Sequence, residues 1–287
     1  MYVTRDKKHY ESEEHPILKG GLEKQFPADQ LFSVESSLDS VVPWLEYVTG
    51  ISGKKVFVFG TGLGGTAVAC ALHVESGKVY GVDISEDAIR KTMIKAEAYG
   101  AADKLELYHS EDTYPLKYED NYFDISVIAA VIEHIVTDRR KYLREVYRVT
   151  KENGIILITG TPNIIYPKDM HTTGLYFIPW LPRKAAYSYA LKRGKWVEGK
   201  DLELSGRKGT SYWHIRRWLK GLNYKIINLE KGFTSNYIRQ HGRLMTRKRK
   251  LLFLPYKAAE RILSGIFRIP IAAFMPYINH LYIRKIK

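Results

Sequence analysis

The chain has 287 residues, of which 45% are hydrophobic, 13% aromatic and 26% charged. This is an ordinary globular composition with enough apolar side chains for a full core. The single cysteine, Cys70, excludes an internal disulfide framework and a Cys-x-x-Cys metal site, and it favours a reducing, cytoplasmic location. The first fifteen residues lack the apolar stretch of a secretory signal, and no uncharged apolar run reaches the ~20 residues of a membrane-spanning helix.

The net charge of +14 is concentrated in one half of the sequence. Residues 1–150 contain 18 Lys and Arg against 24 Asp and Glu, whereas residues 151–287 contain 27 against 7. This asymmetry predicts an anionic partner for the C-terminal half: a nucleic acid, an acidic membrane surface or a phosphorylated substrate. The alternative is a basic surface that only keeps the protein in solution, because composition alone does not identify a partner.

Hydrophobic patterning predicts alternating helices and strands from residue 33 onward. A helix over 33–49 precedes a strand over 54–60, a glycine-rich turn and a buried helix over 66–74. Ser85 is placed to cap a later helix. The apolar runs of the strands fit a sheet covered on both faces, so we expect an α/β fold, a doubly wound, Rossmann-like, mostly parallel sheet with helices on both faces. The remaining strands are expected at 78–83, 104–109, 123–131 and 154–160, and the remaining helices at 85–99 and 137–150.

Five segments make up the expected domain organisation. Residues 1–50 form an N-terminal helical segment and residues 51–160 the Rossmann-like core. Residues 161–209 are rich in Pro, Tyr, Trp, Lys and Arg and show no clean strand, so we expect an insertion that forms a lid over the acceptor. Residues 210–238 add a helix and a strand to the core. Residues 239–287 form a basic amphipathic extension, whose last element, residues 278–286, could be an edge strand.

A glycine-rich loop between the first strand and its helix predicts a nucleotide-like cofactor. Gly60, Gly62 and Gly64 would let the backbone approach a ligand closely, which a Cβ atom would block. Asp83 ends the second strand about twenty residues later, where a carboxylate can accept hydrogen bonds from ribose hydroxyls. Gly60, Gly62 and Gly65 also satisfy the dinucleotide pattern G-x-G-x-x-G, so the loop alone fits either S-adenosylmethionine or NAD.

Four segments, in order, resemble class I S-adenosylmethionine-dependent methyltransferases, most closely the small-molecule branch that includes the quinone-biosynthesis (type 11) enzymes. VFVFGTGLGG (56–65) is similar to the first motif of that family, and VYGVDIS (79–85) to its ribose-binding second motif. DNYFDISVIAAVIEHI (120–135) resembles the family's fourth-strand segment. LREVYRVTKENGIILITGTPN (143–163) resembles its helix, turn, fifth strand and Thr-Pro-Asn exit.

The resemblance implies S-adenosyl-L-methionine as the cofactor. One departure is Val58, which stands where the family usually has an acidic residue near the methionine amino group. An inactive adaptor that keeps the fold and binds the cofactor therefore stays an alternative. The position that would contact the adenine after the third strand has three candidates, Ser110, Glu111 and Asp112. The other residues implied to bind the cofactor are Phe59, Gly60, Thr61, Gly62, Gly64, Asp83, Ile84 and Ala129.

Two histidines are candidates for the chemistry of the acceptor. A hydroxyl acceptor benefits from a general base with a pKa near the working pH, and His is the usual choice. His134 follows the fourth strand, at the edge where ligands bind in open α/β sheets, although it could equally cap or pack the next turn. His171 and Asp169 lie in the insertion and could face the acceptor or bind a divalent ion with Glu133 and His134. No metal site is predicted, because sequence cannot show whether these ligands converge.

The C-terminal part has the pattern of a membrane-surface helix. Basic residues 247–250 run directly into apolar residues 251–254, and the following helix has an apolar and a polar face. We expect contact with an anionic membrane surface through residues 247–267; packing within the protein, dimerisation and nucleic-acid binding are the alternatives. Segment 177–196 also combines Trp and Tyr with Lys and Arg, as suits a lipid headgroup zone. The expected apolar face contains Ala259, Ile262, Leu263, Ile266 and Phe267, and the polar face Lys257, Glu260, Arg261, Ser264 and Arg268.

These features predict a methyltransferase that uses S-adenosylmethionine at a membrane surface. Its acceptor would be a small lipophilic or lipid-linked molecule, such as a quinone or a lipid-linked saccharide, methylated on oxygen. The protein would be cytoplasmic and peripheral on the inner face of the membrane. Three alternatives remain: a methyltransferase for RNA or another polyanion, an oxidoreductase that binds NAD, and the inactive adaptor.

Overall fold

The computed structural model describes residues 15–27, 30–241 and 247–287, and the side chains of residues 241–252 lie outside this description. The chain divides into two compact units. The first consists of the residues up to Ile128 together with Glu145–Ile156, and the second of Ala129–Arg144 together with Leu157–Lys287. Each unit is described below by itself.

Parallel strands form the centre of the first unit. β1 (Lys55–Phe59) pairs with β2 (Lys78–Asp83) on one side and with β4 (Phe123–Ala129) on the other. β2 in turn pairs with β3 (Leu105–His109), which gives the order β3-β2-β1-β4. β1 and β2 are almost entirely buried, as their apolar runs require of strands covered on both faces. The strands predicted at 54–60, 78–83, 104–109 and 123–131 are confirmed, each within two residues.

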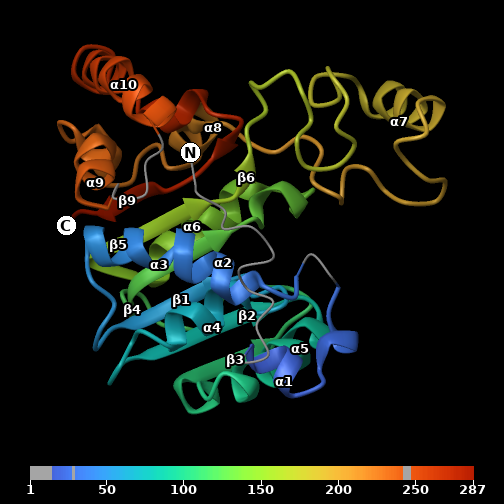
Figure 1. The fold of residues 1–287 in the computed structure, drawn as a ribbon, viewed down its shortest axis with the longest axis vertical. Coiled ribbons are helices and arrows are strands. Elements are labelled where there is room, and N and C mark those ends of the chain that lie inside the picture. The colour runs from blue at the N-terminus through green and yellow to red at the C-terminus, as the bar shows by residue number, and fades with distance from the viewer. Residues whose placement is uncertain (1–14, 28–29, 242–246) are drawn as a thin grey trace. The chain divides into compact units, whose positions relative to one another are not determined.

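The helices of the first unit cover this sheet. α4 (Gly65–Ala71) contacts β1 and β2, and α5 (Glu86–Ala98) contacts β2 and β3 (Figure 1). The predicted cap of α5 is confirmed, because the Ser85 side chain accepts a hydrogen bond from the Ala88 N–H. A short helix, α1 (Pro16–Lys19), precedes them.

The predicted helix over 33–49 is two helices in the structure. α2 (Ser33–Ser40) ends before Val41, and α3 (Val42–Val48) begins with Pro43 in its first turn. Proline suits this position because its missing N–H would have no partner at a helix start. α2 contacts α4, so the N-terminal helices are packed onto the core.

Two strand pairs belong to the second unit. β6 (Thr161–Pro162) pairs antiparallel with β8 (Tyr277–Ile278), and β7 (Tyr224–Ile226) pairs antiparallel with β9 (Leu281–Lys285). The seven-stranded sheet has the order β3-β2-β1-β4-β5-β9-β7, where β5 is Thr150–Thr159. The expected edge strand at 278–286 is therefore wrong in position: β9 lies between β5 and β7, and β7 is the edge. The reason is that strand order depends on pairings between segments far apart in the sequence, which the strand pattern alone does not reveal.

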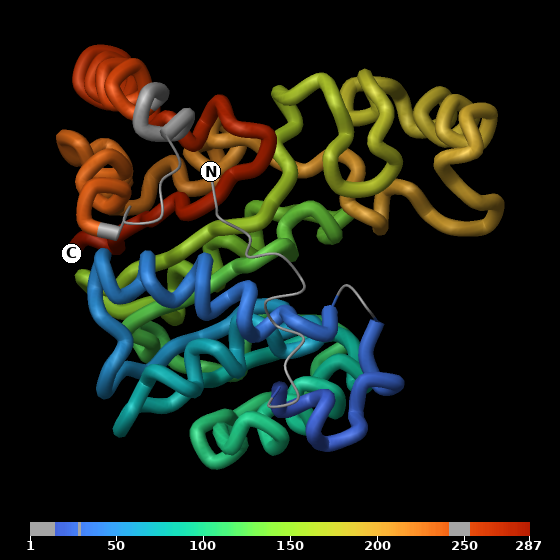
Figure 2. The backbone as a smooth tube through the Cα atoms, viewed as in Figure 1, coloured from blue at the N-terminus to red at the C-terminus, as the bar shows by residue number. Residues whose placement is uncertain are grey.

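Five helices complete the chain: α6 (Arg139–Val149), α7 (Arg183–Lys192), α8 (Tyr212–Trp218), α9 (Phe233–His241) and α10 (Arg247–Gly265). α7 and α10 lie well apart from one another in the second unit (Figure 2). Within the described residues, none of the helices is both long enough and apolar enough to cross a lipid bilayer.

The 161–209 segment carries a small core of its own. Ile178, Ala186, Ala190 and Leu202 are buried together. Arg207 is buried beside them, donates hydrogen bonds to the backbone oxygens of Ile178 and Leu181, and pairs with Glu203. The segment is thus held by packing and by a satisfied buried charge, as burial of a guanidinium requires.

Candidate functional site

The glycine loop between β1 and α4 is fixed by two side chains of the first unit. The Gly62 N–H donates a 2.8 Å hydrogen bond to Asp83 Oδ2, and Thr92 Oγ1 donates a 3.1 Å bond to the Gly62 carbonyl. Gly64 has φ of +85°, and a Cβ there would lie 2.9 Å from the Thr92 side chain. Glycine is therefore required at Gly64 both for its backbone conformation and for contact with α5.

Asp83 retains capacity for a ligand. Its Oδ1 accepts a 3.0 Å hydrogen bond from the Ser85 N–H and its Oδ2 accepts the bond from Gly62, and a carboxylate has about four acceptor positions. A Cβ built on Gly62 would meet no atom within 4 Å, so the space beside the loop is open. Thr61 Oγ1 is buried without a hydrogen-bond partner among the described residues. Together these groups fit the ribose and methionine portions of S-adenosylmethionine.

An apolar surface adjoins the carboxylate. Ile84 directly follows Asp83 and is 67% exposed, although isoleucine is usually buried. His109, at the end of β3, contacts the Ile84 carbonyl through Nε2 at 3.2 Å. If Asp83 binds a ribose, the exposed Ile84 side chain beside it could pack against the face of the attached adenine ring.

The other predicted cofactor residues differ in what they offer. Phe59 is buried in the core, so its side chain cannot face a ligand. Asp112 accepts a hydrogen bond from the Tyr114 N–H, and Ser110 Oγ donates to the Asp112 carbonyl, so both side chains shape the turn after β3. The exposed Glu111 carboxylate makes none of the hydrogen bonds found among the described residues and is the freest of the three adenine candidates. Ala129 ends β4 and is the first residue of the second unit.

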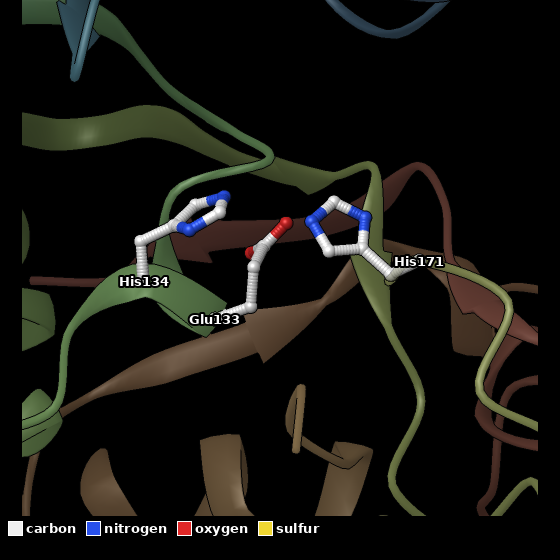
Figure 3. A group of neighbouring side chains, drawn as sticks. All are labelled: Glu133, His134 and His171. Atoms are coloured by element: carbon white, nitrogen blue, oxygen red, sulfur yellow. The ribbon is translucent and has the colours of Figure 1, made fainter. Parts of the chain in front are cut away.

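A second group of functional side chains lies in the second unit. Glu133, His134 and His171 each bring one ligand atom to a place where all three lie within 4.8 Å of one another. Figure 3 shows the Glu133 carboxylate lying between the two imidazole rings, whose centroids are 5.5 Å apart. The structure thus brings both predicted catalytic histidines together.

Glu133 is unusual because it is fully buried and both of its carboxylate oxygens lack a hydrogen-bond partner among the described residues. Burial raises the pKa of Glu133 to about 7, since a carboxylate removed from water favours its neutral form. Burial also lowers the pKa of His171, and the neighbouring His134 lowers it further. Glu133 and His171 are therefore in weakly solvated places that disfavour charge, whereas His134 is exposed.

His134 is held in one tautomer. Its Nδ1 lies 2.8 Å from the carbonyl oxygen of Leu204, and because a carbonyl only accepts, Nδ1 carries the proton. The other ring nitrogen, Nε2, is then left with a lone pair for a proton or a metal ion. The bond to Leu204 fits both expectations for His134, the base and the residue that packs a turn.

The residues that support the group were not identified from the sequence. Arg139 donates hydrogen bonds to the backbone carbonyls of Glu133 and Ile135, which fixes the turn that follows β4. Gly206 has φ of +87°, and a Cβ there would lie 2.8 Å from Glu133 Cγ and 3.1 Å from His171 Cδ2. Nothing in the sequence distinguishes Arg139 and Gly206 from the other arginines and glycines of the chain.

Asp169 does not join the group. Its Oδ1 accepts hydrogen bonds from the His171 and Thr172 N–H groups, and its Oδ2 accepts from the Thr173 N–H and hydroxyl. With these acceptor positions used, the carboxylate shapes the turn that carries His171 and is not a metal ligand. The expectation that Asp169 could face the acceptor or bind an ion is therefore wrong.

Apolar side chains are exposed on α10, with polar ones turned inward. Ile266 is 72% exposed and Ile262 48%, whereas Glu260 and Ser264 are buried. Glu260 accepts hydrogen bonds from the Thr234 and Ser235 N–H groups, at the start of α9. The basic side chains of 247–250, which the sequence assigned to a membrane anchor, lie outside the described residues.

Exposed aromatic side chains occur in the insertion. Tyr176, Phe177 and Trp180 are each more than half exposed, with ring centroids 5.8 to 6.2 Å apart along the series. The Trp180 indole N–H donates to the Ile164 carbonyl at 2.7 Å, which fixes the ring in place. Large exposed rings of this kind are characteristic of binding surfaces.

Comparison with known proteins finds similarity over the central part of the chain. Residues 58–158 match a family model described as a methyltransferase domain. The chain is 31% identical over 154 residues to a demethylmenaquinone methyltransferase of Bacillus mycoides, covering 53% of this chain and 63% of that protein. It is 32% identical over 127 residues to a ubiquinone/menaquinone biosynthesis C-methyltransferase of Geotalea daltonii, covering 42% and 52%. The chain thus spans less than two thirds of the length of these curated relatives.

Among solved structures, the chain is similar to a methyltransferase of Aquifex aeolicus described as dependent on S-adenosylmethionine. The TM-score is 0.46 and the identity 18%, with 72% of this chain and 90% of that chain covered.

Proposed function

We propose that this chain, which carries a class I S-adenosylmethionine-dependent methyltransferase domain, methylates a small lipophilic acceptor at an anionic membrane surface. The acceptor class is a quinone-type headgroup or a lipid-linked saccharide that presents a hydroxyl group, and the methylated atom is oxygen. The methyltransferase activity is proposed because residues 58–158 match the model of a methyltransferase domain, and the glycine loop and Asp83 support it.

The first unit supplies the donor side of the reaction. S-adenosylmethionine brings a methyl group already activated on a sulfonium ion, so the chain mainly has to align donor and acceptor. Asp83 holds the ribose, Ile84 packs on the adenine, and Gly60 and Gly62 leave room for the backbone to contact the methionine portion. Val58 is buried in β1, so the methionine amino group has no carboxylate at that position and depends on backbone carbonyls.

His134 is the proposed base for the acceptor. His134 Nε2 takes the proton of the acceptor hydroxyl, and the hydroxyl oxygen forms a bond to the methyl carbon as the carbon–sulfur bond breaks. Glu133 and His171 lie beside this nitrogen and orient the acceptor. The relative from Geotalea daltonii is named as a C-methyltransferase. In a phenol-type acceptor, loss of the same proton also raises the electron density on ring carbons, so product analysis must identify the atom.

The membrane part of the proposal rests on α10 and the aromatic series. Ile262 and Arg261 are exposed on α10, and Ile266 and Arg268 are exposed in the segment that follows the helix. Apolar and basic side chains on one helix suit an anionic lipid surface. Tyr176, Phe177 and Trp180 have the composition of a headgroup zone.

The first experiment is a calorimetric titration of the full chain with S-adenosylhomocysteine and, separately, with NAD. We expect micromolar binding of S-adenosylhomocysteine and none of NAD. The protein is then incubated with S-adenosylmethionine labelled on the methyl group and a membrane lipid extract, and labelled products are identified by mass.

A matched pair of variants tests the acceptor base. His134→Asn should lower the turnover at least a hundredfold, the usual contribution of a general base, with unchanged S-adenosylhomocysteine affinity. His214→Asn, on α8 and stacked on Trp218, should leave turnover unchanged.

Binding of NAD alone would reject the methyltransferase, and cofactor binding without transfer to any lipid fraction would favour an inactive adaptor.

A further inference from the structure

The Glu133 carboxylate poses a physical problem that the acceptor chemistry does not solve. It is completely buried, and neither oxygen makes a hydrogen bond of good geometry among the described residues, while the neighbouring Thr161 hydroxyl and Arg139 guanidinium offset its burial only in part. Buried polar groups are almost always paired, and leaving a carboxylate unpaired is costly whether it is charged or neutral. A group that meets both oxygens is therefore expected at this place.

Two imidazoles adjoin the carboxylate on the side that lacks a partner. The three ligand atoms lie within 4.8 Å of one another, and ligands about 2.0–2.2 Å from a common zinc ion lie roughly 3–4 Å apart. Small side-chain rotations would close this difference. Glu133 and His134 are adjacent in the chain, and His171 comes from the insertion, so the ligands reach the place from two separate loops (Figure 3).

We propose that Glu133, His134 and His171 form a binding site for a divalent transition-metal ion. Two imidazoles and one carboxylate favour Zn²⁺, Fe²⁺ or Co²⁺ over Mg²⁺ and Ca²⁺, which prefer oxygen ligands alone. The sequence alone predicted no metal because His171 lies 37 positions after His134 in the numbering and its approach depends on the fold.

The surroundings of the three side chains match those of a metal site. Metal-binding histidines usually donate their second ring N–H to a carbonyl or carboxylate, and His134 Nδ1 donates to the Leu204 carbonyl. Arg139 holds the turn that carries Glu133, and Asp169 holds the turn that carries His171. Gly206 lets its own loop approach both ligands, because a Cβ there would clash with Glu133.

Three protein ligands leave a coordination position open, as in catalytic rather than structural metal sites. This part of the inference rests on the proposed function: the open position would take the acceptor hydroxyl. With the ion bound, His134 Nε2 would be a ligand and could not also be the base, so this inference would replace the base role of His134 in the proposed function: the ion would lower the pKa of the bound hydroxyl, and its proton would pass to solvent.

The test is a calorimetric titration of the full chain, first treated with a chelator and dialysed, with Zn²⁺ alone. We expect one equivalent to bind with micromolar or tighter affinity, and Co²⁺ to give the visible absorption of a site with nitrogen and oxygen ligands. Glu133→Gln and His171→Asn should each weaken Zn²⁺ binding at least tenfold, whereas His214→Asn should not change it.

Folding and function are controlled separately. The metal titration of a variant is interpreted only if the variant keeps the thermal unfolding midpoint and the S-adenosylhomocysteine affinity of the parent chain. Gly206→Ala perturbs the same site without changing a ligand, because its Cβ would clash with Glu133. Absence of Zn²⁺ binding, or binding that Glu133→Gln and His171→Asn leave unchanged, would overturn the metal site. Methyl transfer that persists after chelation would overturn the metal's role and leave the methyltransferase intact, whereas Zn²⁺ binding without any transfer would support the site and contradict the proposed function.

Discussion

Asp83 combines two tasks in one carboxylate. It accepts hydrogen bonds from the backbone of the glycine loop and from the start of α5, and its remaining acceptor positions are proposed to hold the ribose. The loop and the ligand contact therefore depend on the same side chain. A substitution should disturb both at once.

We predict that Asp83→Ala weakens S-adenosylhomocysteine binding at least tenfold, or about 1.4 kcal/mol. The variant loses the ribose contact and also frees the Gly62 N–H that positions the loop. Calorimetric titration measures the effect. Asp87→Asn, an exposed acidic residue in the first turn of α5 that pairs with Arg90 and Lys91, is the matched control and should bind as the parent does. Equal affinities of Asp83→Ala and the parent would contradict the ribose assignment.

His280 connects stability to pH in the second unit. Burial lowers the pKa of His280 to about 3, whereas in the unfolded chain it is about 6.5. Below pH 6.5 the unfolded chain therefore takes up a proton that the folded chain does not, so the unfolding free energy decreases as the pH falls from about 6.5 toward 3. At pH 5 this amounts to about 2 kcal/mol.

Urea unfolding at pH 7 and pH 5 measures this effect in the parent and in His280→Asn. Asparagine does not titrate and tolerates the φ of +51° at this position. We expect the variant to lose less unfolding free energy between the two pH values than the parent. Identical losses would show that His280 is not the group that titrates.

The candidate site was only partly predictable at the level of residues. Asp83, His134 and His171 follow from motif and position, because the ends of parallel strands and the loops after them are where ligands bind. The role of Asp169 was not predictable, since only the structure shows its oxygens occupied by the 171–173 turn. Thr92 and Gly206 contribute through contacts between distant segments, and no local pattern reports such contacts.

At the level of elements, α10 presents its polar side inward. Glu260 acts as the N-terminal cap of α9 from a different helix, with both oxygens bonded to backbone N–H groups. The helix therefore docks through a charged side chain and leaves Ile262 and Ile266 outside. The predicted division into an apolar and a polar face is not observed, because Arg261 of the predicted polar face is exposed beside Ile262 whereas Glu260 and Ser264 are buried.

Removing this cap should cost stability. We predict that Glu260→Ala lowers the unfolding free energy by about 1–3 kcal/mol, because two buried N–H groups lose a charged acceptor. Glu260→Gln, which keeps one good acceptor oxygen, should lose less. Glu230→Ala removes an exposed ion pair with Lys225 and should change the value by no more than about 0.5 kcal/mol. Denaturant unfolding compares the three variants, and a Glu260→Ala value near that of Glu230→Ala would contradict the capping role.

The fold of the first unit was largely predictable from the sequence. Apolar runs of five to seven residues between glycine and polar turns correspond to β1 to β4, and the Ser85 cap begins α5 as expected. The break between α2 and α3 was missed because apolar spacing continues across Pro43. The place of β9 was missed because strand order depends on pairings between residues far apart in sequence.

At the scale of the whole molecule, charge and exposed apolar surface are both features of the C-terminal half. Twenty-seven of the 45 Lys and Arg residues follow residue 150, and the exposed side chains of α10 and of the 176–180 series lie in the same part of the chain. In the proposed membrane association, charge would draw the chain to an anionic bilayer and apolar burial would retain it there. Neither contribution alone gives stable attachment.

We predict that the chain sediments with vesicles of phosphatidylglycerol and phosphatidylcholine but not with phosphatidylcholine alone. Changing Arg247, Lys248, Arg249 and Lys250 to Gln should weaken this binding at least tenfold at low salt, since each basic residue near an anionic surface contributes ~1 kcal/mol. The pair Ile262→Glu and Ile266→Glu should weaken it at both low and high salt. Ile286→Glu, at an exposed position after β9, is the control. If the basic and the isoleucine variants both sediment as the parent does, the membrane surface is rejected and an RNA or protein partner is favoured. Salt-dependent binding of RNA would then distinguish an RNA partner from a protein partner.

The position of β9 has a kinetic consequence. β7 ends at Ile226 and pairs with β9, which begins only at Leu281, so α9 and α10 lie in the loop that this pairing closes. Pairings between residues so far apart form slowly, because the chain loses the entropy of a long loop before the contacts compensate for it. The backbone groups of β7 that bond to β9 therefore stay unpaired until α9, α10 and β9 have been synthesised and have folded. During that interval the unfinished chain exposes a strand edge to other chains, and in a growing cell this is the stage at which a chaperone would be most useful.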